Sequence, residues 1–154
     1  MCIMNSKTKE GASEGTQRAR RGREGAEALE LDELTHQIIG AAMKVHTAPG
    51  PGLLESAYEA CLSYELVKAG FEAERQKRLP VVYESLRLEE GYRIDLLVER
   101  EVIVELKAIA RIDELHKAQL LSYLRLSDCR LGLLINFHTS HLRDGICRVI
   151  NTRR

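Results

Sequence analysis

The chain has 154 residues, of which 44% are hydrophobic and 30% are charged, and its formal net charge at pH 7 is zero. This length suits one domain with its own core, and no apolar run is long enough to cross a membrane as a helix. The four cysteines are scattered without the spacing of a metal site, which excludes a cysteine zinc site and a disulfide scaffold. We therefore expect a cytoplasmic protein that does not contact the membrane.

Charge is unevenly distributed along the sequence. Acidic residues outnumber basic ones between residues 29 and 106, and the reverse holds between residues 107 and 154. A cation site next to a polyanion site would produce this pattern. Two ordinary solvated surfaces would produce it as well.

Residues 1–28 are rich in Gly, Ser, Glu and Arg and contain few large apolar groups, so we expect a disordered tail there. Order is expected to begin near Leu29, because apolar residues recur at helical spacing over residues 31–45. The Pro-Gly-Pro-Gly run at residues 49–52 ends this helix.

A second helix is predicted over residues 53–69, with Gly70 closing its carboxyl end. Its apolar stripe consists of Leu54, Ala57, Tyr58, Cys61, Leu62 and Leu66.

The pattern after Gly70 is that of strands. Strands are expected at residues 79–83, 86–88, 92–98 and 102–109, with turns at 84–85 and 99–101 and a turn or bulge at 89–91. A helix follows over residues 113–126, and residues 131–137 form an apolar run typical of a central buried strand. The predicted order is α-α-β-β-β-α-β, with a further strand at 145–150. The fold class is therefore α/β, a mixed central sheet flanked by helices.

The strand VIVELKAIA, residues 102–110, places Glu105 and Lys107 on one face between isoleucines, while its other face is entirely apolar. If the turn before it is centred on Arg100, Asp95 lies opposite Glu105. Two neighbouring carboxylates repel unless a cation lies between them, and Mg²⁺ suits such a pair. The alternative is an ion-paired hairpin at a solvated sheet edge, which explains Glu105 and Lys107 but not Asp95.

Three sequence motifs together resemble a known family. The residues Asp95, Glu105 and Lys107 resemble the active-site motif of the PD-(D/E)XK nuclease superfamily, although Ile94 replaces the proline of that name. Residues 52–58, GLLESAY, are similar to the GxxExxY signature of a bacterial protein family within it. Residues 119–123, QLLSY, resemble the QxxxY motif of its RecB-like branch. The resemblance spans residues 31–151, and residues 29–154 are expected to be one such domain.

The resemblance implies a restriction-endonuclease-like core and metal-dependent hydrolysis of phosphodiester bonds in nucleic acid, DNA rather than RNA. Mg²⁺ or Mn²⁺ would be held by Asp95 and Glu105, with Glu55 as a further ligand. Lys107 and Gln119 complete the implied catalytic set, and Tyr58 and Tyr123 would bind substrate.

Each of these residues has a structural alternative. An acid at position 55 also suits the start of a helix, Tyr58 also suits a core, and Gln119 and Tyr123 also suit a helix surface. The alternative hypothesis for the whole protein is a non-catalytic module that keeps the nuclease fold to bind nucleic acid or protein. Its small size suggests a homodimer or a larger protein partner.

Overall fold

A computed structural model describes residues 14–152 of the chain. The helices are α1 (Glu14–Thr47), α2 (Glu55–Lys68) and α3 (Glu114–Ser127), with a short 3₁₀ helix η1 (Leu142–Gly145). The strands are β1 (Ala73–Tyr83), β2 (Leu86–Val98), β3 (Val102–Lys107), β4 (Leu131–Asn136) and β5 (Ile146–Ile150).

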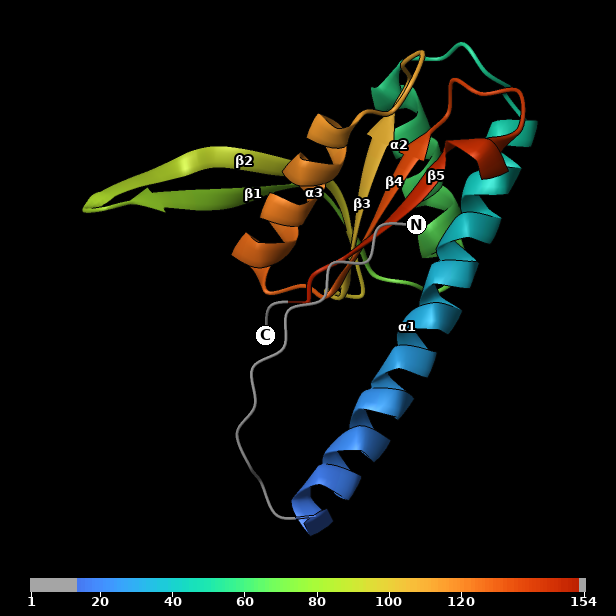
Figure 1. Cartoon of the computed structure of the whole chain (residues 1–154). Helices are drawn as coiled ribbons and strands as arrows, with labels where there is room; N and C mark the ends of the chain where they lie inside the picture. The colour runs from blue at the N-terminus through green and yellow to red at the C-terminus, as the bar shows by residue number, and fades with distance from the viewer. Residues whose placement is uncertain (1–13, 153–154) are drawn as a thin grey trace.

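The strands form one mixed sheet in the order β1-β2-β3-β4-β5 (Figure 1). Neighbouring strands are antiparallel except β3 and β4, which are parallel because α3 connects them. This arrangement confirms the predicted α/β class and element order, including the further strand at the carboxyl end.

Helices cover both faces of the sheet. Apolar residues of α1 and α2 pack with one face, and those of α3 pack with the other, so the core has two layers. The alternation predicted for β3 is present, because Val102, Val104 and Leu106 belong to the first layer and Ile103 belongs to the second. Each layer removes apolar surface from water, which is the main driving force for this fold.

The start of α1 differs from the prediction. The helix begins at Glu14 and not near Leu29, and in Figure 1 its amino-terminal part extends beyond the sheet. Ala, Glu, Gln and Arg favour helix even where they bury little, and the sequence analysis had interpreted their low hydrophobicity as disorder. Residues 1–13 of the expected tail lie outside the described residues.

The first two strands are longer than predicted. Strand β1 begins at Ala73 and not at Leu79, and β2 is continuous over the expected turn or bulge at residues 89–91. A register shift is present there, between Leu79 and Val81 on β1. The far end of this hairpin extends away from the rest of the sheet (Figure 1).

Helix α2 ends as predicted, with Gly70 at a φ of +94°. Cys61 is exposed and not in the apolar stripe. Within residues 14–152, no helix has the length and apolar character needed to cross a bilayer.

Candidate active site

The β2–β3 hairpin brings the two predicted carboxylates together. Its register pairs Leu96 with Val104, the last pair of the ladder, so the next residues outward, Asp95 and Glu105, face each other. This confirms the expected turn centred on Arg100. Beyond the ladder the carboxylates accept hydrogen bonds from backbone N–H groups.

Two contacts join Asp95, Glu105 and Lys107, and a third ties Asp95 to the backbone of β3. The Asp95 N–H donates to Glu105 Oε1 at 3.3 Å, and the Leu106 N–H donates to Asp95 Oδ2 at 2.9 Å. Lys107 Nζ lies 3.7 Å from Glu105 Oε2, and its side chain is only 18% exposed. Asp95, Glu105 and Lys107 therefore lie together, as the sequence predicted, and are called the carboxylate cluster below.

Burial perturbs the ionisation of both acids. Glu105 is 4% exposed, and burial, followed by the charge of Asp95, raises its pKa from 4.5 to about 8. The pKa of Asp95 is also raised, mainly by burial and by the neighbouring Glu59 carboxylate, although the Leu106 N–H and Lys107 oppose the shift. Such strongly perturbed groups are typical of functional sites.

Glu55 lies near this cluster but does not contact either acid directly. It is the first residue of α2, and its Oε2 accepts a hydrogen bond from the Ala108 N–H at 2.9 Å. Its charge contributes to the raised pKa values of Asp95 and Glu105. Glu55 therefore connects the start of α2 to the end of β3, at the edge of the carboxylate pair.

Tyr58 does not have the surface needed to contact substrate. It is fully buried, and its ring stacks on Phe137 with 4.3 Å between centroids. The hydroxyl donates to Gly50 O at 2.6 Å and accepts from the Leu53 N–H at 3.1 Å. The predicted substrate contact is therefore corrected to the structural alternative, a core tyrosine that fixes the turn before Glu55.

Gln119 and Tyr123 share one face of α3, as their spacing predicts. Gln119 Nε2 donates to the Tyr123 hydroxyl at 2.7 Å, so this bond joins the two residues of the QxxxY segment. Tyr123 is 4% exposed, and burial, with the charge of Glu105, raises its pKa to about 12. The phenol is therefore neutral and lies within electrostatic range of the acids.

The sequence analysis missed Glu59 and Gln76. Glu59 is 4% exposed and accepts hydrogen bonds from Arg75 Nε, at 2.8 Å, and from Gln76 Nε2. Gln76 Nε2 also lies 3.4 Å from Asp95 Oδ1, so this amide bridges two acids. The sequence did contain a signal for Glu59, because it lies four residues after Glu55 on α2, next to the apolar stripe, and therefore near the same helix face.

The backbone at Gln76 is irregular. Its φ is +53°, a conformation that non-glycine residues rarely adopt. On the neighbouring strand, Ile94 and Leu97 pack in the same layer although strict alternation would separate them. The side-chain alternation of β2 is therefore broken around Asp95, and such irregularities concentrate at functional sites.

Asn136 is a second polar residue that the sequence analysis missed. It is 2% exposed, it pairs with Lys107 in the parallel register, and its amide exchanges two hydrogen bonds with the Ile109 backbone. These bonds hold the chain immediately after Lys107.

The donor set suits a hard divalent cation. Asp95 is half-buried and Glu105 is buried. Burial, followed by nearby carboxylates, raises the pKa of both, so a cation between them would favour their charged forms. Among residues 14–152, however, no group of three or more His, Cys, Asp or Glu side chains is close enough to form a metal site. The protein would therefore supply two direct ligands, and water or phosphate oxygens would supply the others.

Comparison with known proteins identifies a family. A family model described as the PD-(D/E)XK nuclease superfamily matches residues 32–149, which include every residue of the carboxylate cluster. No curated protein and no solved structure shows significant similarity.

Proposed function

The chain belongs to the PD-(D/E)XK nuclease superfamily, and from this premise we propose that it is a metal-dependent nuclease that hydrolyses phosphodiester bonds, with DNA as the expected substrate. The observation that carries the proposal is the pair of neighbouring carboxylates, half-buried Asp95 and buried Glu105, with Lys107 beside it. Removing ionisable groups from water costs several kcal/mol unless their charges are offset. When both acids are ionised, Lys107 supplies one positive charge against two negative ones, and a divalent cation would offset the remainder.

Asp95 and Glu105 are the proposed ligands of Mg²⁺ or Mn²⁺, with Glu55 completing the set through a water molecule. A bound divalent cation supplies a Lewis acid for the phosphate and lowers the pKa of a bound water. The Leu106 N–H fixes one oxygen of Asp95, and the Ala108 N–H fixes one oxygen of Glu55. The end of β3 therefore orients both acids before substrate arrives.

Lys107 is the proposed electrostatic group. Its ammonium lies beside Glu105 and is mostly buried, so it can neutralise charge that develops on the phosphate oxygens. Gln119 and Tyr123 are proposed to line the substrate groove. The segments GLLESAY and QLLSY support membership of the GxxExxY family and of the RecB-like branch, respectively.

The test is metal-dependent cleavage. Circular single-stranded DNA, supercoiled duplex DNA and RNA are each incubated with Mg²⁺, Mn²⁺ or EDTA. We expect cutting that requires metal and that disappears in Asp95→Asn and Lys107→Ala. Lys68→Ala is the control, because this exposed lysine lies at the opposite end of α2 from Glu55. Cutting that survives Asp95→Asn would overturn the assignment of the site.

One observation favours the non-catalytic alternative. The carboxylates also accept hydrogen bonds from the backbone where the β2–β3 ladder ends, which is a structural role that needs no cation. Calorimetry with Mn²⁺ distinguishes the metal-dependent nuclease from the non-catalytic module. Binding that Asp95→Asn abolishes supports the metal site, and no binding together with no cleavage supports the non-catalytic module.

A further inference from the structure

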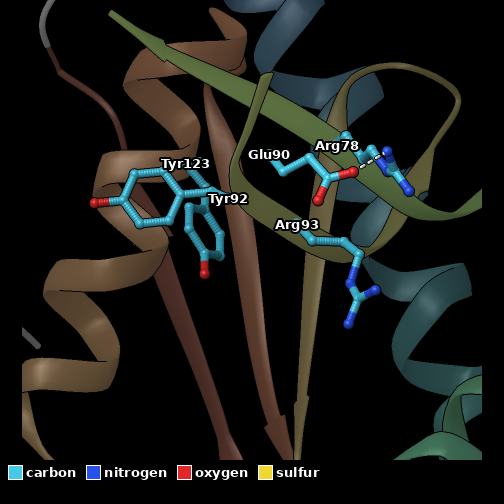
Figure 2. A pocket seen from close by; sticks show the side chains of 6 residues that line it. Arg78, Glu90, Tyr92, Arg93 and Tyr123 are labelled. Atoms are coloured by element: carbon cyan, nitrogen blue, oxygen red, sulfur yellow. Dashed lines mark hydrogen bonds and ion pairs between the residues drawn. The ribbon is translucent and has the colours of Figure 1, made fainter. Parts of the chain in front are cut away.

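A pocket of about 320 Å³ lies between the β1–β2 hairpin and α3 (Figure 2). Two tyrosines and two arginines dominate its wall, and none of the four belongs to the carboxylate cluster. The lining residues are Arg78, Glu90, Gly91, Tyr92, Arg93 and Tyr123.

Tyr92 presents a fixed aromatic surface in this pocket. Its ring lies 5.2 Å from that of Tyr123 at 56°, a tilted arrangement that aromatic pairs prefer. Tyr123 is itself held by burial and by Gln119. Tyr92 remains 38% exposed, so it offers a rigid ring to a ligand at little cost in side-chain entropy.

The charges of the pocket leave one cation available. Arg78 forms an ion pair with Glu90 (Figure 2), and these two charges cancel. Arg93 is exposed, and its guanidinium forms no ion pair or side-chain hydrogen bond within residues 14–152. The pocket therefore combines an aromatic surface with one uncompensated guanidinium, which suits a planar anion such as a nucleotide.

The β2 strand connects this pocket to the carboxylate cluster. Tyr92 precedes Asp95 by three residues on β2, which corresponds to about 10 Å along a strand. Roughly three stacked nucleotides span that distance along a nucleic-acid strand. Tyr123 lines the pocket, and the charges of Glu105 and Asp95 contribute to its raised pKa, so the two acids lie within electrostatic range of the pocket wall.

The shape of the pocket depends on the irregular hairpin. Leu79 pairs with Tyr92, but Val81 pairs with Leu88, so β2 has extra residues opposite Pro80, which cannot donate a backbone hydrogen bond. A Cβ at Gly91 would lie 2.3 Å from Val81 Cγ2, so only glycine fits. Bulges of this kind redirect side chains near functional sites.

We propose that this pocket binds an unpaired nucleotide of single-stranded nucleic acid, with the base stacked on Tyr92 and a phosphate at Arg93. The proposal rests on the proposed nuclease function and names its substrate as a single strand or a single-stranded region. Aromatic rings recognise bases that are not already stacked in a duplex. A paired duplex cannot present a base face to Tyr92 without unpairing.

The test measures binding in EDTA, so that it does not depend on cleavage. Fluorescence anisotropy compares a labelled short thymidine oligonucleotide with a duplex of equal length. We expect tighter binding of the single strand, a loss of at least about fivefold in Tyr92→Ala and retention in Tyr92→Phe. Arg93→Ala should reduce the salt-dependence slope by about 0.7.

Matched controls come from the exposed end of the same hairpin. Tyr83 is 69% exposed and Arg87 pairs with Glu89, and neither lines the pocket. We expect Tyr83→Ala and Arg87→Ala to bind the single strand as the wild type does. Circular dichroism melting of each variant verifies that it is folded.

The outcomes separate this inference from the proposed function. If cleavage depends on metal but wild type and Tyr92→Ala bind the single strand equally well, the proposed nucleotide binding in the pocket is wrong and the proposed nuclease function stands. If single-strand binding requires Tyr92 but no cleavage occurs, the proposed nucleotide binding is supported and the proposed nuclease function is wrong. If the protein prefers duplex, or binds an acidic peptide but not the oligonucleotide, the proposal that the pocket binds an unpaired nucleotide is wrong.

Discussion

The backbone N–H of Asp95 donates a hydrogen bond to Oε1 of Glu105, with 3.3 Å between the two atoms. This contact ties the Glu105 carboxylate to the backbone of Asp95 where the β2–β3 ladder ends, and burial raises the pKa of both acids. A site built in this way stores unfavourable electrostatic energy when both acids are ionised. It favours a ligand that brings positive charge.

The stability of the metal-free protein should therefore fall as pH rises. Unfolded Glu105 releases its proton near 4.5, whereas the folded protein retains it up to about 8. Between these values the unfolded state binds fewer protons, so the free energy of unfolding decreases with pH, by at most about 1.4 kcal/mol per pH unit for this group. Urea denaturation in EDTA across this range measures the effect.

The control for the pH effect is Glu105→Gln, which cannot ionise and should flatten the dependence over the same range. Mn²⁺ added to the wild type should restore stability most strongly near pH 8, where the carboxylate is free to bind it. A wild-type free energy of unfolding that rises between pH 5 and 8 in EDTA would contradict the raised pKa assigned to Glu105.

Glu59 should support the metal site without binding the metal. Gln76 connects its carboxylate to Asp95, so Glu59→Gln removes a negative charge and loosens the bridge. We expect divalent-cation affinity to fall roughly 10- to 100-fold, measured by calorimetry with Mn²⁺. Glu65→Gln, on the same helix but paired with Lys68, should leave the affinity unchanged. If Glu59→Gln binds Mn²⁺ as tightly as Glu65→Gln does, the prediction is wrong.

Tyr58 should matter for stability and not for substrate affinity. Tyr58→Phe keeps the stacked ring on Phe137 but loses the hydrogen bonds to Gly50 O and the Leu53 N–H. We expect the free energy of unfolding to fall by about 1–3 kcal/mol, measured in urea. A variant as stable as the wild type, with weaker binding of oligonucleotide, would instead restore the substrate-binding role.

Gly91 should tolerate no side chain. In Gly91→Ala the new Cβ would meet Val81 Cγ2 at 2.3 Å and Val81 Cβ at 2.7 Å, so the hairpin must shift at a cost of about 1–3 kcal/mol. Because Tyr92 is the next residue, oligonucleotide binding should weaken as well. Thermal melting and anisotropy test both effects.

The control for Gly91 is Gly40→Ala in α1, where a Cβ meets nothing within 4 Å. Alanine favours helix over glycine, so this variant should gain about 0.4–1 kcal/mol of stability. If Gly91→Ala also gains stability, the close approach of Val81 is not a constraint on this hairpin.

The hairpin that carries Asp95 and Glu105 could be predicted because its information is local. The turn at residues 99–101 sets the register, and alternation within β3 then determines which side chains share a face. The same locality explains why the helix periodicities and the order of elements were correct. The start of α1 was missed because low hydrophobicity does not distinguish a helix from a disordered tail.

By itself, the sequence determined the family motifs, the hairpin register and the neighbouring positions of Asp95, Glu105 and Lys107. Only the tertiary structure decided that Tyr58 is buried, that Glu59 and Gln76 join the site, and that Tyr92 and Arg93 line a pocket near it. The physical reason is that turns and periodicity act between near neighbours in the chain. Burial and electrostatic contact depend instead on which elements pack together, and here those elements are α2, the irregular β1–β2 hairpin and α3.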